Sequence, residues 1–408
     1  MPLKLILVSP DGTIFGNDRK VKQEVIKDLI TFIQRMSSKK VRIALWSRHT
    51  WTIEGKTLDA LLTERASVSV RHFVAAQGNL KARQYSGSVD PILAELGVQK
   101  HETILVGAGD ADFKAGVNNG LLLVRPAWYG EEIDYGFRVS SIGRLARFCE
   151  VFALREHPIY WVIDDGPLHV MSMGPFSTYL EAFAEFGADA KLVAKDNAGD
   201  AKFWFLMIVS SLYFSGLAHA TDIICPFPGH DPAAFGATRR LLDSTMSLFG
   251  KCFRVPYFPD LIVRHTKSLK SQKLSPSQRT FVNHLNTIQL NRHPHKYGSD
   301  KVNKAAISLK KKTVLVVDDF LTNGRSLDTA RAYINAAGGN AILFSWLKTI
   351  NSSYHRMIPD PPLKPFQQNH VITEPAHTGY GYFPHVADAH APVEIQQVLD
   401  AYRQWTWP

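Results

Sequence analysis

One stretch, VLVVDDFLTNGRS at residues 314–326, constrains the fold more than any other part of the chain. Four apolar β-forming residues lead into Asp318 and Asp319, a short loop follows, and a helical pattern runs from Leu327 to Ala337. Loop amides and a helix N-terminus can bind an anion, while carboxylates accept hydrogen bonds from hydroxyl groups. A ligand that carries both a diol and a phosphate would suit this stretch.

The stretch resembles the phosphoribosyl-pyrophosphate (PRPP) motif of type I phosphoribosyltransferases, in which an apolar strand precedes D-D-x-x-T-T-G-x-T/S. Asn323 stands where the family has its second threonine. The resemblance implies that Asp318 and Asp319 hold the ribose hydroxyls and, through them, an Mg²⁺ ion. It also implies that the 5′-phosphate is bound by the loop residues Thr322, Asn323, Gly324, Arg325 and Ser326.

Further segments are similar to the branch of this family typified by the competence protein ComF. DIICPFPGH places Pro228, Gly229 and His230 after an apolar strand, where that branch binds pyrophosphate through loop amides. LVAKDNAGDAKFW, residues 192–204, is similar to a Lys-containing stretch of the branch. The resemblance makes segment 264–312 a flexible basic loop that closes over PRPP. Its candidates to face pyrophosphate are Arg264, Lys267, Lys270, Lys273 and Arg279.

Residues 1–148 alternate strand and helix patterns, which indicates a parallel sheet covered on both faces. Apolar strands are expected at Leu3–Val8, Val41–Trp46, His72–Ala76, Thr103–Val106 and Leu121–Val124. For the whole chain the expected fold class is α/β, with two doubly wound, mainly parallel-sheet domains.

The first half resembles the haloacid-dehalogenase-like (HAD) phosphohydrolases that lack a cap domain. Residues at the positions of the four family motifs are Ser9 and Asp11, then Ser47, then Lys81 with Arg83 as an alternative, then Ala108, Asp110 and Asp112. Ser9 stands where the family has its nucleophilic aspartate, and Ala108 replaces the first acid of the fourth motif. A serine hydroxyl is a weak nucleophile and a poor Mg²⁺ ligand, so we expect this half to lack phosphatase activity. Asp110 could restore some metal binding.

The expected organisation is a HAD-like domain at 1–148, a junction at 149–158, a phosphoribosyltransferase domain at 159–350 and a Pro/His-rich extension at 351–408. Within it we expect a hairpin turning at Asp165-Gly166, helices at Tyr179–Phe186 (ending near Gly187) and Lys202–Leu217, and a terminal helix at Val393–Tyr402. The histidines of the extension, His370, His377, His385 and His390, have spacings that fit no compact metal motif.

The net charge is +10, and twelve Lys or Arg residues lie between Arg264 and Lys312 against one acid, Asp300. This excess favours a polyanionic partner, which could be a pyrophosphate, a nucleotide or a nucleic acid; a solvated surface loop is the alternative. Three cysteines without paired spacing support neither disulfides nor zinc. Without a leader or a membrane-spanning run, we expect a cytoplasmic protein. A protein partner or a homo-oligomer stays open.

The leading interpretation is an Mg²⁺-dependent phosphoribosyltransferase whose acceptor is a nucleobase, a nucleoside or a nucleic acid. The HAD-like half would be a scaffold or docking module. The resemblance implies that purine-salvage members of the family often carry an acidic residue in this loop, beside the bound base. Thr322 supplies no acid there, which disfavours hypoxanthine or guanine salvage. An alternative is a protein that senses PRPP or a nucleotide in a bacterial stress or phage-defence system. A third is a phosphatase that acts through Asp11 or Asp110.

Overall fold

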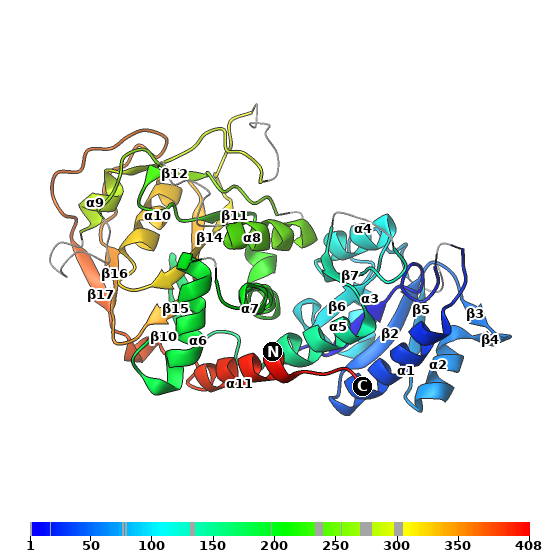
Figure 1. Cartoon of the computed structure of the whole chain (residues 1–408). Coiled ribbons are helices and arrows are strands. Elements are labelled where there is room, and N and C mark those ends of the chain that lie inside the picture. The colour runs from blue at the N-terminus through cyan, green and yellow to red at the C-terminus, as the bar shows by residue number, and fades with distance from the viewer. Residues whose placement is uncertain are drawn as a thin grey trace.

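The computed structural model describes residues 2–16, 18–75, 77, 80–130, 135–196, 198–232, 240–253, 255–269, 280–297 and 305–408. Its two main sheets lie in the two halves of the molecule and are both mainly parallel, which confirms the α/β class (Figure 1).

The first sheet has six parallel strands in the order β5-β2-β1-β6-β7-β8. Their bounds are β1 Leu5–Val8, β2 Arg42–Ser47, β5 Arg71–Val74, β6 Thr103–Val106, β7 Leu122–Pro126 and β8 Phe137–Val139. All four residues of β1 are apolar and buried, as a central strand with both faces covered requires. The five strands expected from the sequence are confirmed, with ends shifted by a residue or two at most places.

Helices cover both faces of this sheet. They are α1 Gln23–Ser38, α2 Leu58–Ala66, α3 Asp90–Leu96, α4 Asp110–Asn119 and α5 Ile142–Arg147. Side chains of α1, α2 and α5 share a core with Ile6 and Val8, whereas those of α3 and α4 share another with Leu5 and Leu7. Alternate residues of β1 are therefore buried in two different cores, because successive side chains of a pleated strand point to opposite faces of the sheet.

The second sheet has the order β11-β14-β15-β10-β9, with only the edge strand β9 antiparallel. Its strands are β9 Trp161–Asp165, β10 Leu168–Phe176, β11 Ile223–Pro226, β14 Thr313–Leu321 and β15 Asn340–Thr349. One face is covered by α6 Glu181–Lys191, α7 Ala201–Phe214 and α8 Arg240–Phe253, and the other by α9 Phe281–Leu285 and α10 Arg325–Ala336. The hairpin predicted at Asp165-Gly166 is the β9–β10 connection.

Three local expectations were wrong. Helix α6 does not end near Gly187 but continues to Lys191. Strand β14 does not end at the two acids, because Phe320 and Leu321 still pair with β15. Segment 264–312 is not a loop throughout: it contains α9, the end of β12 (Ile262–Arg264) and β13 (Ile288–Leu290), because apolar residues such as Phe281 and Ile288 are buried in the core.

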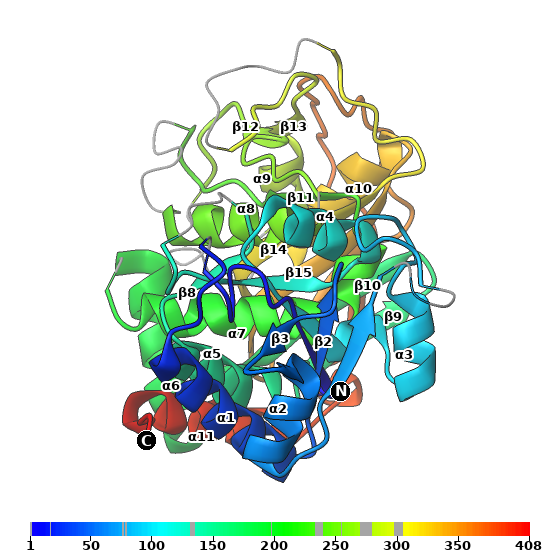
Figure 2. The ribbon, with the colours of Figure 1, turned by 90° about the vertical axis from the view of Figure 1, so that its right-hand side faces the viewer.

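The two halves share one apolar core. Helix α7 carries much of it, and its Tyr213 hydroxyl donates to Lys100 O of the first half at 2.7 Å. The C-terminal helix α11 (Ala391–Gln404) runs along the lower side of the molecule in both views (Figures 1 and 2). Beyond α11, Trp405 Nε1 donates to Glu150 Oε2 at 2.9 Å, and Glu150 also forms a two-pronged ion pair with Arg35. The C-terminal segment thus contacts both halves.

Among the described helices, none is both long enough and apolar enough to cross a lipid bilayer.

Candidate functional site

In the first half, a buried arginine lies at the centre of the residues that follow β1 and β6. Arg83 Nη1 is 3.1 Å from Ser9 Oγ and 2.6 Å from Trp46 O, and Arg83 Nη2 is 2.9 Å from Asp112 Oδ1. Ser9, Arg83 and Asp112 are all buried. A guanidinium therefore occupies the position between the hydroxyl and the carboxylate where a metal ion would have to bind.

The same arginine compensates a buried carboxylate. Burial raises the pKa of Asp112, while Arg83, the Gly109 amide at 3.1 Å and the Ser9 hydroxyl act in the opposite direction. The oxygens that contact the guanidinium are one hydroxyl, one carboxylate and the Trp46 carbonyl, so a single ionised group is available to a metal ion among them. These residues do not fit an Mg²⁺ ion while Arg83 is in place.

For the other HAD-motif candidates, no hydrogen bond or ion pair to Ser9, Arg83 or Asp112 is present among the described residues. Asp11, Lys81 and Asp110 are exposed, and Asp110 forms an ion pair with Lys114 at 2.6 Å. Ala108 is buried and has no polar side-chain atom. Ser47 Oγ lies 2.5 Å from His49 O and 2.7 Å from His72 Nε2. The structure therefore brings Arg83, rather than Lys81, into contact with Ser9 and Asp112.

In the second half, the two acids lie within β14, three and two residues before its end. Asp318 Oδ1 accepts from the Asp319 amide at 3.0 Å, and Asp319 Oδ1 accepts from the Phe320 amide at 2.8 Å. The other oxygen of Asp319 forms an ion pair with Lys195, from the π-helical turn Leu192–Asp196 after α6.

The predicted phosphate loop connects β14 to α10. Thr322 Oγ1 lies 3.0 Å from Thr349 Oγ1, and Asn323 O accepts from the His355 amide at 2.9 Å. Gly324 is the left-handed N-cap of α10, which begins at Arg325. The amides of the first helical turn have no carbonyl partner within their own helix, so this N-terminus can donate to an anion.

The side chains of the last two loop residues are half-buried. The Arg325 guanidinium carbon lies 5.6 Å from the centroid of the Phe281 ring, and Ser326 occupies the second position of α10. Phe281 begins α9 in the basic segment, so this segment packs directly against the loop.

The proline-containing loop follows β11, which is the parallel neighbour of β14. Pro228 is buried, Gly229 is exposed and His230 is half-buried. Arg264 Nε donates to Gly229 O, and the Ser268 amide donates to His230 O at 2.9 Å. Because β11 and β14 run in the same direction, this loop and the phosphate loop lie at the same edge of the sheet, where ligands bind in open α/β folds.

The basic candidates differ in their surroundings. Arg264 is buried, and its Nη1 also donates to Thr287 Oγ1 at 2.5 Å, so it holds the two segments together. Lys267 is exposed and forms an ion pair with Asp231 at 2.7 Å. Lys270, Lys273 and Arg279 lie outside the described residues.

Comparison with known proteins gives weak resemblances. No family model and no curated protein matches the chain. A putative phosphoglycolate phosphatase from Lactobacillus delbrueckii subsp. bulgaricus is 14% identical, with 29% of this chain and 51% of that chain covered and a TM-score of 0.23. The cobalt-bound deoxy-D-mannose-octulosonate 8-phosphate phosphatase from Haemophilus influenzae is 14% identical, with 36% and 87% covered and a TM-score of 0.27.

A third solved structure, from Moraxella catarrhalis, is 3-deoxy-D-manno-octulosonate 8-phosphate phosphatase with magnesium, phosphate and KDO. It is 11% identical, with 36% of this chain and 84% of that chain covered and a TM-score of 0.27. Further matches are named as HAD hydrolases. This chain spans about half the length of the Lactobacillus protein. TM-scores this far below 0.5 do not establish function.

Two lysines at the second site were not singled out from the sequence. Lys195 lies in the stretch 192–204 that resembles the ComF branch, so that resemblance was the available signal. Lys348 follows an apolar strand pattern and is fully buried near the end of β15. Lys348 Nζ lies 2.7 Å from Thr322 O and 2.6 Å from both Ser352 O and Ser352 Oγ. Lys348 therefore holds Thr322, at the start of the phosphate loop, next to Ser352.

Replacing Lys348 by methionine is expected to remove a pH dependence of stability. Burial lowers the pKa of Lys348 from 10.5 to about 7. Between these values the unfolded chain binds a proton that the folded chain does not, so the wild type gains stability as the pH rises. The gain is about 5 kcal/mol over that interval. Urea unfolding at a series of pH values from roughly 6 to 10 measures it.

Lys114→Met is the matched control, because Lys114 is an exposed lysine in an ion pair. It should leave the pH dependence of the wild type unchanged. A constant difference in unfolding free energy between wild type and Lys348→Met at all pH values would show that Lys348 keeps its proton in the fold.

Proposed function

We propose that the second half is an Mg²⁺-dependent phosphoribosyltransferase that binds PRPP at the carboxyl edge of its sheet. The observation that carries the proposal is the order of groups along β14 and α10. An acid pair, a short loop and a helix N-terminus follow one another, beside the loop that follows β11.

Each part of this edge has a defined chemical role in the proposal. Asp318 and Asp319 accept hydrogen bonds from the ribose hydroxyls, since ionised carboxylates are acceptors only. The amides at the start of α10 donate to the 5′-phosphate. The Gly229 position is open, because a Cβ added there would have no heavy atom within 4 Å, so a pyrophosphate can approach the backbone at this point.

Lys195 adds a cation next to the acid pair. Its ion pair with Asp319 keeps one carboxylate oxygen occupied, so ligand binding requires Lys195 to turn towards the pyrophosphate or to share the carboxylate. The half-buried acids fit Mg²⁺, which prefers oxygen ligands and keeps several of them from water and substrate. The ion, held through the ribose hydroxyls, would neutralise charge on the pyrophosphate as it leaves.

For the first half we propose a HAD-like scaffold without phosphatase activity. The support is the position of Arg83, which places a permanent cation between Ser9 and Asp112. Ser9 Oγ accepts a hydrogen bond from Arg83 and supplies no anionic nucleophile.

The proposal predicts that PRPP with Mg²⁺ raises the melting temperature of the wild type. Saturating ligand stabilises a folded protein by about 2–4 kcal/mol at 100 to 1,000 times its dissociation constant, which corresponds to a shift of several degrees. Asp318→Asn combined with Asp319→Asn should abolish the shift, because neutral amides lose the charge that orders the hydroxyls and the metal. Asp110→Asn, an exposed acid in the other half, is the matched control and should keep it.

No shift in the wild type, or an equal shift in the double variant, would contradict the assignment of this site. Release of pyrophosphate in the presence of bases, nucleosides or oligonucleotides then measures transfer. A thermal shift without release would favour a protein that senses PRPP or a nucleotide over a transferase.

A further inference from the structure

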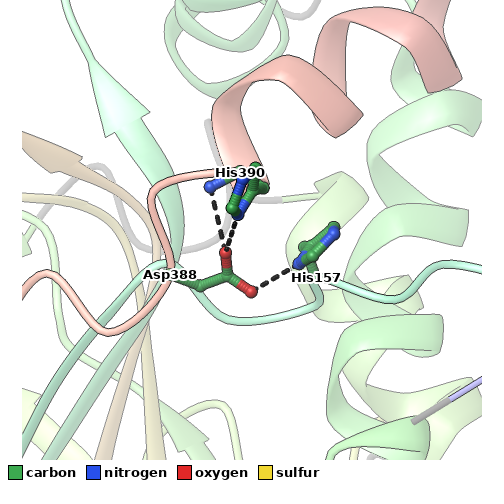
Figure 3. A group of neighbouring side chains, drawn as sticks. All are labelled: His157, Asp388 and His390. Atoms are coloured by element: carbon green, nitrogen blue, oxygen red, sulfur yellow. Dashed lines mark hydrogen bonds and ion pairs between the residues drawn. The ribbon is translucent and has the colours of Figure 1, made fainter.

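Two histidines and an aspartate meet where the C-terminal segment crosses the junction between the halves. Asp388 lies between His157 and His390, and each imidazole directs a nitrogen towards its carboxylate (Figure 3). His157 Nδ1 is 2.5 Å from Asp388 Oδ2, and His390 Nδ1 is 3.5 Å from Asp388 Oδ1. One ligand atom from each residue lies within 4.8 Å of the other two.

Backbone contacts hold the two contributing segments in register. The Ala387 amide donates to Tyr160 O at 2.9 Å, which fixes the chain just before Asp388. On the other side, Glu394 Oε1 accepts from the His157 amide at 3.2 Å. The three side chains are therefore presented by segments whose relative position is set by other bonds, and little reorganisation is needed for binding.

The spacing is close to that of a metal site. Zinc bonds of about 2.0–2.1 Å in a tetrahedral arrangement place neighbouring ligand atoms about 3.3 Å apart. The His390–Asp388 distance of 3.5 Å is near this value. The His157–Asp388 contact of 2.5 Å must widen by less than about 1 Å, which a small rotation of the partly exposed His157 ring provides.

The exposure of the cluster leaves room for solvent ligands. The side chains of His157 and Asp388 are 31% and 26% exposed, whereas that of His390 is 80% exposed. One carboxylate and two imidazoles therefore offer ligand atoms at a place that solvent can reach.

We propose that His157, Asp388 and His390 bind a divalent transition-metal ion of the Zn²⁺ type, with water completing the coordination. Imidazole nitrogens with one carboxylate suit zinc and its neighbours in the first transition row, whereas Mg²⁺ prefers oxygen ligands alone. Bound there, the ion joins the start of α11 to the junction at residue 157. The site is distinct from the acid pair of β14 and does not depend on the proposed transferase activity.

Calorimetric titration of Zn²⁺ into the untagged, chelator-treated full chain tests the site. One ion per chain is expected, and His157→Ala or His390→Ala should weaken binding at least tenfold, since even outer-shell changes cost about 10–100-fold. His370→Ala is the matched control, because His370 is an exposed histidine of the same extension outside the cluster. It should bind zinc as the wild type does.

Co²⁺ supplies a second readout, because a four-coordinate Co²⁺ ion absorbs intensely in the visible range. The band should appear in the wild type and be lost in His390→Ala. Since His390 is mostly exposed, this variant should keep the melting temperature of the metal-free wild type, so the test stands even if His157→Ala fails to fold. Zinc binding that is absent from the wild type, or equal in wild type and His390→Ala, would overturn the proposal.

Discussion

Replacing Arg83 by methionine is expected to destabilise the protein by about 3–5 kcal/mol at neutral pH. The substitution removes the only cation paired with Asp112 among the described residues and leaves a buried carboxylate that keeps only the Gly109 amide and the Ser9 hydroxyl as donors. The Trp46 carbonyl and the Ser9 hydroxyl lose a donor at the same time. Urea unfolding of the variant against the wild type measures the loss.

The pH dependence of this loss has a defined sign. Burial already raises the pKa of Asp112 above its ordinary value of 3.8, and removing Arg83 raises it further. The folded variant then holds a proton that the unfolded chain releases as the pH rises above about 4, so its stability falls with rising pH. The deficit should be small near pH 4 and largest above the folded pKa of Asp112.

Adding Asp112→Asn to Arg83→Met is the decisive control. The double variant has no buried charge, so it should recover most of the lost stability and lose the extra pH dependence. A loss below about 1 kcal/mol for Arg83→Met alone, the range of exposed ion pairs, would contradict a buried pair at this position.

Replacing Gly324 by alanine should cost about 3 kcal/mol or more and disrupt the phosphate loop. Gly324 has φ +74°, a left-handed conformation that is strained for alanine, and a Cβ there would lie 2.1 Å from Tyr354 Cδ2. The Tyr354 ring cannot swing aside freely, because it is fully buried and its hydroxyl donates to Asp328 Oδ1 at 3.2 Å. Equilibrium unfolding in urea measures the loss, and the PRPP-dependent thermal shift should disappear with it.

Gly338→Ala separates the cost of backbone strain from the cost of the clash with Tyr354. Gly338 lies beyond the other end of α10 with φ +82°, but the nearest heavy atom to its Cβ is 3.6 Å away. This variant carries the backbone strain without the clash, so its cost should be about 1–2 kcal/mol. Equal losses in Gly324→Ala and Gly338→Ala would show that Tyr354 makes room.

Most strands of both sheets could be predicted because their signals are local. An apolar run such as Leu5–Val8 is buried on both faces, and the alternation of strand and helix patterns leads to a parallel sheet. The order of acid pair, loop and helix at 314–326 was likewise visible in a single stretch. The end of strand β14 could not be predicted from this stretch, because Phe320 and Leu321 extend the strand by pairing with β15.

The partners of the candidate site residues could not be predicted, because they come from distant parts of the chain. Lys195 meets Asp319 across 124 residues, and His157 meets Asp388 across 231. Histidine spacing within the extension gave no metal motif because one of the three ligands lies in the junction. The sequence also could not decide between Lys81 and Arg83 as the basic residue of the third motif. The choice depends on which side chain is buried, and two positions so close in sequence do not reveal this.

The shared core around α7 limits how the two halves can be exchanged during evolution. Phe203 and Trp204 of α7 belong to the same apolar cluster as Val8 of the first sheet and Trp346 of the second. Exchanging either half for a homologous unit would remove the surface on which these side chains are buried, unless α7 and the C-terminal segment were exchanged as well. The two halves are therefore poor candidates for independent shuffling, and substitutions at their shared surface are constrained to change together.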